Sequence, residues 1–236
     1  MARISGQPRT SVQSVSSVHA HELNYNSTIR QPPMPLTTVI FDIGGVLVRT
    51  EDLEPRRAWE RRFGLPDWGL ARIVFDNPVA AAATLGRAGL DEVWAEVGRQ
   101  LALTPGDLAQ LREDFWKGDR YDQDLIGYLR SLRPRYKTGI ISNAWPGVRE
   151  AHQAYLNGET FDVIVYSAEA GLAKPDPAIY RLALKQLGVA ASEAVFVDDV
   201  PENVEAARAL GMAGVQFKTG MDAAAVRAEF AALGIR

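Results

Sequence analysis

The chain has 236 residues, of which 47% are hydrophobic, and a formal net charge of −3. This length and apolar content allow one domain of ordinary size with a sizeable core and a small insertion. The nearly balanced charge, without a strongly basic block, argues against nucleic acid or an anionic membrane as a partner. No apolar run approaches the length of a membrane span.

Cysteine and histidine usage removes several kinds of chemistry. The chain has no cysteine, which excludes disulfides, thiolate catalysis and thiolate metal sites and is consistent with a reducing compartment such as the cytoplasm. Two of the three histidines, His19 and His21, lie near the N-terminus, and His152 stands alone. A histidine-based triad or a multi-histidine metal site is therefore not expected.

Residues 1–35 differ in composition from the rest of the chain. They are rich in Ser, Gln and Asn and carry a single acid, Glu22. Such a segment buries too little apolar surface to offset its ordering entropy, which predicts a disordered tail. It also lacks the apolar core of a secretory signal. Met34-Pro35-Leu36 stands directly before the first predicted strand, so an upstream extension is one interpretation of this segment.

The stretch from Thr37 to Leu47 organises the predicted fold. Its first half is a continuous β-branched and aromatic run, which predicts a strand buried on both faces. Asp42 ends this run, and Gly44-Gly45 then allows a sharp turn and a close approach of the backbone to a ligand. An acid at the carboxyl end of a parallel strand lies where open α/β sheets place their chemistry.

Three further apolar runs end in polar residues. Gly139-Ile140-Ile141 precedes Ser142-Asn143, and Val195-Phe196-Val197 precedes Asp198-Asp199. The run 163–166 precedes Ser167 and, shortly afterwards, Lys174-Pro175. Parallel strands would bring these ends together at one edge of the sheet.

Residues 51–120 interrupt the strand pattern and predict an all-helical insertion. Val93, Trp94, Val97 and Leu101 fall at helical spacing. Thr104-Pro105 predicts a helix start, with Thr104 as N-cap and Pro105 in the first turn. The tryptophans of this segment are expected mainly in its core.

Alternating strands and helices resume at Tyr121. Helices are predicted near 123–133, 177–187, 201–210 and 222–233, the second ending at Gly188. Strands are predicted at 161–166, 194–197 and 215–217.

The ordered set Asp42, Ser142, Lys174 and Asp198-Asp199 resembles the four motifs of the haloacid dehalogenase superfamily. The match extends from about Thr37 to Phe217, and the helical insertion is similar to the small cap of that family. The resemblance implies a Rossmann-like doubly wound parallel sheet, α/β in class, formed by residues 36–50 and 121–236, with a cap formed by residues 51–120. It is closest to the phosphatase branch, including sugar-1-phosphate phosphatases.

The resemblance also implies roles for individual residues. Asp42 would be the nucleophile and pass through an aspartyl-phosphate. Mg²⁺ would be held by Asp42, the Gly44 carbonyl, Asp198 and Asp199, all of them hard oxygen donors. Ser142 and Asn143 would donate hydrogen bonds to phosphate, and Lys174 would bring a positive charge to the same oxygens. The expected partner is a small phosphorylated metabolite, with oligomeric state left open.

One position departs from the family pattern. Phosphatases of this family usually carry a second Asp two residues after the nucleophile, and here that position is Gly44. A general acid normally contributes about 10²–10⁴-fold to the rate. A substrate with a good leaving group needs less protonation, so turnover remains possible, whereas mutase chemistry, which needs that acid, is disfavoured.

Three other functions remain as alternatives of unequal weight. A metal-free 2-haloacid dehalogenase also lacks the second Asp, but it has no use for the adjacent acids Asp198-Asp199, which are costly to bury together without a cation. A catalytically weak phosphate- or partner-binding module is consistent with Gly44. A phospho-receiver domain is disfavoured, because there the acidic pair comes first along the chain and here it comes last. Substrate identity is expected to depend on the cap, near Arg87, Trp116 or Trp145.

Overall fold

The computed structural model of the protein describes residues 35–236. The predicted tail, residues 1–35, therefore lies outside the described residues except for Pro35, as does any extension before Met34. The described residues belong to a single unit, Pro33–Arg236. None of its described helices is long and apolar enough to cross a membrane.

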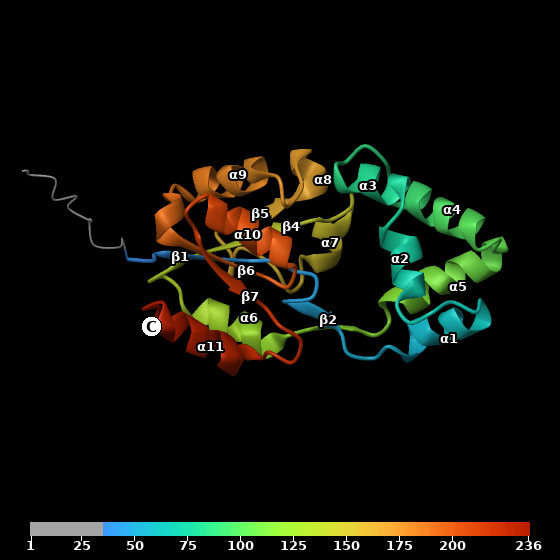
Figure 1. Ribbon diagram of the computed structural model, residues 1–236, viewed down its shortest axis with the longest axis horizontal. Coiled ribbons are helices and arrows are strands. Elements are labelled where there is room, and N and C mark those ends of the chain that lie inside the picture. Colours follow the sequence, from blue (N-terminus) through green and yellow to red (C-terminus); the bar gives the residue numbers. More distant parts are fainter. Residues whose placement is uncertain (1–34) are drawn as a thin grey trace, which may run out of the picture. The chain divides into compact units, whose positions relative to one another are not determined.

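A parallel sheet of five strands lies at the centre of residues 35–236. The strands are β1 (Thr38–Phe41), β4 (Lys137–Ser142), β5 (Val163–Tyr166), β6 (Ala194–Asp198) and β7 (Ala213–Gln216). Their order is β5-β4-β1-β6-β7, and every neighbouring pair is parallel. The chain thus winds outward from β1 in both directions, which confirms the predicted doubly wound α/β fold (Figure 1).

Helices cover both faces of this sheet, and each face has its own apolar core. On one side lie α6 (Gln123–Ser131) and α11 (Ala223–Ala232); on the other lie α9 (Pro177–Leu187) and α10 (Pro201–Ala209). Shorter elements complete this part: α7 (Val148–His152), α8 (Ser167–Ala170) and a 3₁₀ turn at Ala191–Glu193.

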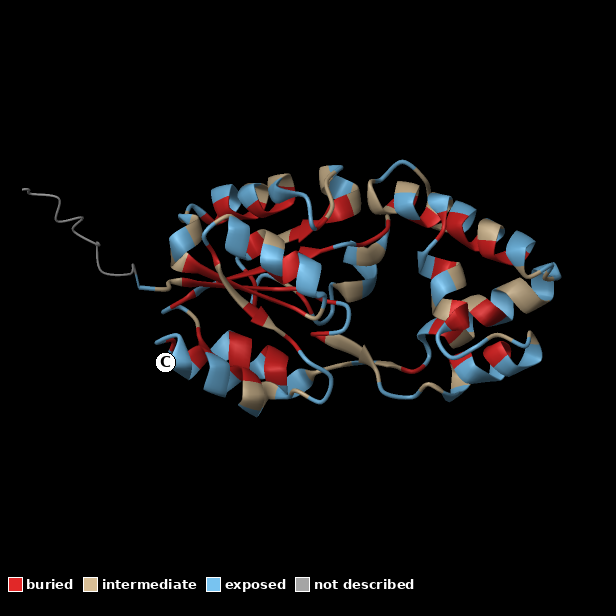
Figure 2. Cartoon of the chain, in the orientation of Figure 1, coloured by how far each residue is buried: buried red, intermediate tan, exposed pale blue. Residues whose placement is uncertain are grey.

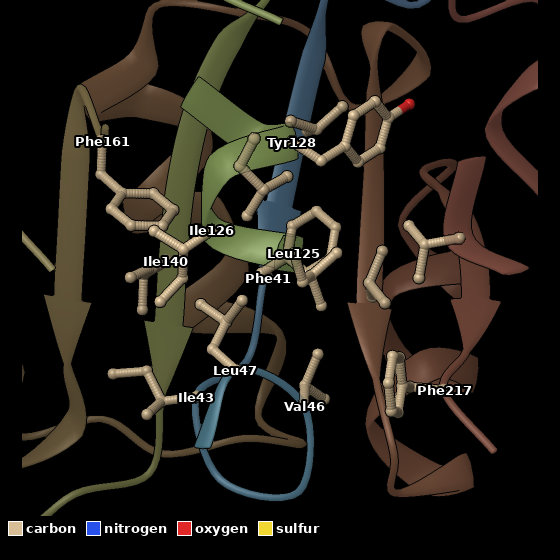
Figure 3. Close-up of a cluster of buried hydrophobic side chains, with 14 of the residues drawn as sticks. Phe41, Ile43, Val46, Leu47, Leu125, Ile126, Tyr128, Ile140, Phe161 and Phe217 are labelled. Atoms are coloured by element: carbon tan, nitrogen blue, oxygen red, sulfur yellow. The ribbon is translucent and has the colours of Figure 1, made fainter. Parts of the chain in front are cut away.

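The position of β1 in the sheet explains why its sequence is apolar without alternation. Phe41 packs into the cluster under α6 and α11, beside Leu125 and Tyr128 (Figure 3). Ile40, the preceding residue, packs into the opposite cluster under α9. Both faces of β1 are therefore buried, as the colouring of the strands in Figure 2 shows.

The helical insertion between β1 and β4 has a core of its own. Its helices are α1 (Glu54–Arg62), α2 (Gly69–Phe75), α3 (Pro78–Thr84), α4 (Leu90–Gln100) and α5 (Pro105–Trp116). Trp59, Trp94 and Phe115 are buried in one cluster within it. The side chain of Thr104 accepts a hydrogen bond from the backbone N–H of Asp107, which confirms Thr104 as the predicted N-cap residue of helix α5. We call residues 54–116 the cap.

Two short strands connect the cap to the core and were missed in the sequence. β2 (Val48–Thr50) pairs antiparallel with β3 (Asp119–Tyr121). The expectation that residues 51–120 are entirely helical is thus corrected at the C-terminal end of that segment. Their sequences, Val-Arg-Thr and Asp-Arg-Tyr, are too short and too polar to show a period-two pattern, so only the pairing itself makes them strands.

Candidate active site

The sheet edge brings together residues that are far apart in the sequence. Asp42 directly follows β1, Ser142 ends β4 and Asp198 ends β6, on three adjacent strands. All three are buried, with 7%, 5% and 0% of their surface exposed. This edge is the point where the strand order reverses, so the predicted strand-end residues meet at the position that open α/β sheets use for ligands.

Lys174 reaches this edge from the loop between α8 and α9. Its Nζ lies 2.7 Å from Asp42 Oδ1 and 2.6 Å from Asp198 Oδ2. Only 1% of the lysine side chain is exposed. One buried ammonium therefore bridges Asp42 of the first motif and Asp198 of the fourth motif.

Asn143 holds the backbone of that lysine. Its Nδ2 donates to the Lys174 carbonyl at 2.9 Å, and its Oδ1 accepts from the Lys174 N–H at 2.8 Å. The side-chain amide that we expected to contact phosphate is thus engaged with Lys174. In this arrangement Asn143 fixes the point from which Lys174 extends into the site.

Asp198 is saturated with donors. Besides Lys174, Asn203 Nδ2 donates to Oδ1 at 3.0 Å and to Oδ2 at 3.1 Å, and the Val200 N–H donates to Oδ1 at 2.8 Å. Asn203 is buried in α10 and was missed as a site residue. The sequence could have indicated Asn203, because it lies five residues after Asp198 in the first turn of a helix that begins at Pro201. Hydrogen bonds of this kind hold a ligating carboxylate in one orientation.

Asp199 has a different environment from its neighbour. It is half-buried and lines the cleft described below. A Cβ atom placed on Gly45 would lie 2.2 Å from Asp199 Oδ2, and Gly45 has a φ of +73°. The glycine is needed here both for its left-handed backbone and for the space that Asp199 occupies.

Asp42, Asp198 and Asp199 together form a candidate cation site. Each offers one carboxylate oxygen, and these oxygens all lie within 4.8 Å of one another. Three carboxylates face the single ammonium of Lys174, so negative charge exceeds positive charge at this point. Oxygen donors and surplus negative charge suit a hard divalent cation such as Mg²⁺.

The pKa values of Asp42 and Asp199 are both raised, in keeping with the excess of negative charge at this site. Burial is the largest influence on Asp42 and raises its pKa from 3.8 to about 6; Lys174 opposes this rise and Asp198 adds to it. Burial also raises the pKa of Asp199, with Asp198 again contributing. Desolvation and like charge both disfavour the ionised acids, so a bound cation would stabilise them.

Ser142 and Ser167 have distinct positions. Ser142 lines the cleft together with Gly44, Asn143 and Asp199. Ser167, completely buried, exchanges hydrogen bonds with the backbone of Ala144: its Oγ accepts from the N–H at 2.9 Å and donates to the carbonyl at 3.1 Å. Ser167 therefore supports the loop that follows Ser142, whereas Ser142 is available to a ligand.

A cleft of about 2080 Å³ lies between this edge and the cap. Its floor contains Gly44, Ser142, Asn143 and Asp199. The cap contributes residues from α2, α4 and α5, and the core contributes the loop after β4 and residues 216–220. The cap meets the core at Gly86, where an added Cβ would lie 2.2 Å from the Ala168 carbonyl oxygen of α8.

Residues 36–211 match the family model of the haloacid dehalogenase-like hydrolases. The chain belongs to this family. The match spans the strand-end acids, Lys174 and the cap, so the predicted family and the expectation of a hydrolase are both confirmed. A sesquiterpene phosphatase of Aspergillus oryzae is 30% identical over 181 residues, which cover 75% of this chain and 87% of the relative.

Two solved structures have folds similar to that of this hydrolase. A HAD family enzyme from Bacteroides thetaiotaomicron, in complex with magnesium and inorganic phosphate, aligns with a TM-score of 0.66 at 19% identity, over 79% of this chain and 96% of that chain. An L-2-haloacid dehalogenase from Xanthobacter autotrophicus, with chloropropionic acid covalently bound, aligns with a TM-score of 0.56 at 21% identity, over 85% and 84%. The two hold different ligands, so the shared fold leaves the reaction to be argued from the site.

Proposed function

We propose that this hydrolase is a Mg²⁺-dependent phosphatase that acts on a small phosphorylated metabolite through an aspartyl-phosphate on Asp42. One observation carries the proposal: the oxygens of three carboxylates lie within 4.8 Å of one another, beside a buried lysine that contacts two of them. The phosphatase among the relatives supports the same reaction class.

The residues present fit a divalent cation. Asp42, Asp198 and Asp199 would hold it, together with the Gly44 carbonyl inferred from the sequence. When bound, Mg²⁺ would screen the repulsion between an anionic nucleophile and an anionic phosphate and polarise the phosphoryl oxygens. The magnesium found with phosphate in the B. thetaiotaomicron enzyme supports this choice of metal.

In the first step an Asp42 carboxylate oxygen attacks phosphorus. A bond forms between that oxygen and phosphorus, while the bond from phosphorus to the ester oxygen breaks and its electron pair leaves with the alcohol oxygen. Lys174 contacts Asp42 Oδ1 and therefore fixes the orientation of the carboxylate. A lysine ammonium has three protons, and the two carboxylate contacts leave one for a phosphoryl oxygen.

In the second step water attacks the phosphorus of the aspartyl-phosphate. The bond from Asp42 to phosphorus breaks, phosphate departs, and the proton of the water passes to solvent or to a phosphate oxygen. The hydroxyl of Ser142, which lines the cleft, would donate to the phosphoryl group in both steps. Developing negative charge would thus meet donors fixed in advance by the fold.

Gly44 sets the leaving-group requirement. Without a carboxylic acid at this position the departing alcohol oxygen takes its proton from water, which favours substrates whose alcohol is acidic. No atom of the described residues, its own chain neighbours apart, lies within 4 Å of a Cβ placed on Gly44. A Cβ atom therefore fits at this position without displacing a neighbour.

The dehalogenase alternative is less well supported by the site. That reaction needs no metal, and buried Asp198 and half-buried Asp199 would then lie beside Asp42 with only Lys174 to offset their charge. A binding module remains the alternative if Gly44 has abolished turnover.

Activity of the full chain against three substrates tests the proposal. Phosphate release from p-nitrophenyl phosphate and from hexyl phosphate would be followed with Mg²⁺ and with chelator, and chloride release from 2-chloropropionate with chelator alone. We expect Mg²⁺-dependent phosphate release that is lost in Asp42→Asn. Gly44→Asp should raise kcat for hexyl phosphate relative to the aryl ester, by about tenfold or more, because only the alkyl leaving group needs an acid.

Metal binding gives a readout apart from activity. Calorimetric titration with Mg²⁺ should show one site that is lost in Asp199→Asn and kept in Asp176→Asn, an acid outside the cluster. Chloride release without metal would establish the dehalogenase instead. Mg²⁺ binding without turnover of either phosphate ester would replace the phosphatase with a binding module.

A further inference from the structure

We infer that the cleft selects phosphate monoesters with an apolar body, a hydrocarbon or aromatic alcohol, over polyhydroxylated ones, and that Phe75 and Trp116 of the cap determine this preference. The inference rests on the proposed function, because it names the substrate class of the same site. Within the expected class of small phosphorylated metabolites, it disfavours sugar phosphates.

An aromatic wall leads from the phosphate site into the cap. Trp145 lies in the loop just after Ser142-Asn143, and its ring centre is 5.4 Å from that of Phe75 at the end of α2. Phe75 lies 6.1 Å from Trp116 at the end of α5. All three line the cleft, so the wall is continuous with the floor that contains Ser142.

Two of these rings, those of Phe75 and Trp116, are exposed although they lie against buried aromatic residues, whereas Trp145 is buried. Phe75 is 45% exposed and Trp116 is 41% exposed, while Phe115, which contacts both, is completely buried. A cap that used these rings only for its own packing would bury them, as it buries Trp94. Exposed aromatic surface that faces a cleft is available for an apolar ligand.

Trp68 adds a third exposed ring to the cleft. It is 53% exposed, and its backbone has a φ of 64°, a left-handed conformation that a bulky residue rarely adopts. The strained backbone turns the chain into α2 with this side chain on the cleft lining. Such strain is often retained where a side chain has a function.

Most charged groups of the lining are held in ion pairs. Arg49 donates to Asp122 at 2.7 Å, and Arg112 donates to Asp91 at 2.7 Å. A third ion pair joins α1 to β3, where the Arg56 guanidinium donates to Asp119 at 2.9 Å. The same guanidinium also donates to the Phe115 carbonyl at 2.6 Å.

Sugar hydroxyls need donors and acceptors that are free to bind them. Within the described lining, Glu113 and Lys218 are the charged side chains outside these pairs and outside the floor, and both are exposed. Where a polyhydroxylated body meets the faces of Phe75, Trp116 and Trp145, it would lose water without gaining hydrogen-bond partners from those rings, which costs binding energy. A hydrocarbon body would gain by the same contact.

Hexyl phosphate and hexitol 6-phosphate form a matched test pair. Both are primary esters with six carbons, and they differ in the hydroxyls of the body. We expect kcat/KM to be at least about tenfold higher for hexyl phosphate, since each buried methylene contributes roughly fourfold. The more acidic alcohol of the hexitol favours it chemically, so this preference would have to come from binding.

Polar substitutions in the wall locate the effect. Trp116→Gln and Phe75→Gln should lower kcat/KM for hexyl phosphate by about tenfold, and more than for acetyl phosphate, which has no body to reach the wall. Leu233→Gln is the control, because Leu233 is also exposed, at 39%, but lies outside the cleft lining. It should leave the ratio of hexyl to hexitol phosphate unchanged.

Each result decides a different claim. Faster turnover of hexitol phosphate, or an equal loss for all substrates in the wall variants, would overturn the apolar preference and leave the phosphatase intact. If no ester and no acetyl phosphate is hydrolysed, the proposed function fails. Calorimetry with Asp42→Asn would then still test the inference, which requires tighter binding of hexyl phosphate than of hexitol 6-phosphate.

Discussion

The floor of the cleft and its cap wall are built on opposite principles. At the floor, Asp198 is completely buried and accepts hydrogen bonds from Lys174, Asn203 and the Val200 N–H. In the cap wall, Phe75 and Trp116 offer exposed rings, and the nearby arginines Arg56 and Arg112 are held in ion pairs.

This difference separates two tasks. Phosphoryl transfer needs groups at fixed positions, and a saturated hydrogen-bond network supplies them. Selection of the substrate body depends on shape and desolvation, which apolar side chains supply with little directional constraint. Substitutions in the floor should therefore lower activity on every substrate, whereas substitutions in the wall should change the choice among substrates.

The largest effect is expected for Lys174→Met, which removes the only cation at the floor within residues 35–236. Asp42 and Asp198 would then face each other without the bridging ammonium. We expect kcat/KM to fall by about 10²–10³-fold on all phosphate esters. The free energy of unfolding, measured by urea titration with chelator, should fall by about 3–5 kcal/mol.

Lys185→Met is the matched control for this substitution. Lys185 lies on α9 and is exposed. Its replacement should change the free energy of unfolding by less than about 0.5 kcal/mol. A loss at Lys174 confined to one substrate would contradict the assignment of Lys174 to the floor.

The next effect contrasts the two glycines of the first turn. Gly45→Ala places a methyl group against Asp199 on a backbone with φ of +73°, whereas the same change at Gly44 meets open space. We expect Gly45→Ala to weaken Mg²⁺ binding by about 10–100-fold and to lower kcat in parallel. Gly44→Ala should have a clearly smaller effect, and equal losses in calorimetry would mean that the position of Asp199 is unimportant.

A smaller effect is expected where the cap meets the core. Gly86 and Gly64 both have a left-handed backbone, with φ of +70° and +62°, but only Gly86 approaches another residue, the Ala168 carbonyl. Alanine at either site should cost about 1 kcal/mol in the free energy of unfolding for the backbone. Gly86→Ala should cost about 1–3 kcal/mol more for the displaced contact.

Substrate kinetics complete that comparison. If the contact at Gly86 holds the wall over the floor, Gly86→Ala should raise KM for hexyl phosphate more than for acetyl phosphate. Equal stability of the two alanine variants in urea titrations would show that the cap and core are not held together at this point.

The smallest effect concerns His152, which lines the cleft on α7 beside Tyr121 and Tyr166. Burial lowers its pKa, and its Nδ1 has no hydrogen-bond partner among residues 35–236. The unfolded chain therefore takes up a proton more readily, below about pH 6.5. The stability contributed by the neutral ring is present above that pH and is lost as the pH falls through the lowered pKa.

His152→Phe should therefore flatten the loss of stability below pH 6.5. Urea midpoints at pH 7.5 and pH 5.0 would measure it, with the difference between the wild-type protein and the variant isolating His152 from the other titrating groups. A wild-type slope that persists in the variant would assign it to other residues.

Local sequence determined much of the core. Thr38–Phe41 is apolar without alternation because both of its faces are covered, and that pattern needs no knowledge of the partners. The N-cap of α5 at Thr104 and the glycine that ends α9, Gly188, likewise depend on neighbours only a few residues away. Asp42, Ser142 and Asp198-Asp199 were visible for the same reason, since each lies at the end of an apolar run, whereas Lys174 lies in the loop after α8.

Only the tertiary structure decided the rest. The amide of Asn143 holds the Lys174 backbone across 31 residues, Asn203 orients Asp198, and β2 pairs with β3 over about 70 residues. The exposure of Phe75 and Trp116, against the burial of Trp94, depends on which face each helix turns to the cleft. Sequence patterns record local preferences for burial and turning, whereas these contacts arise from packing between distant segments, which leaves no period in the chain.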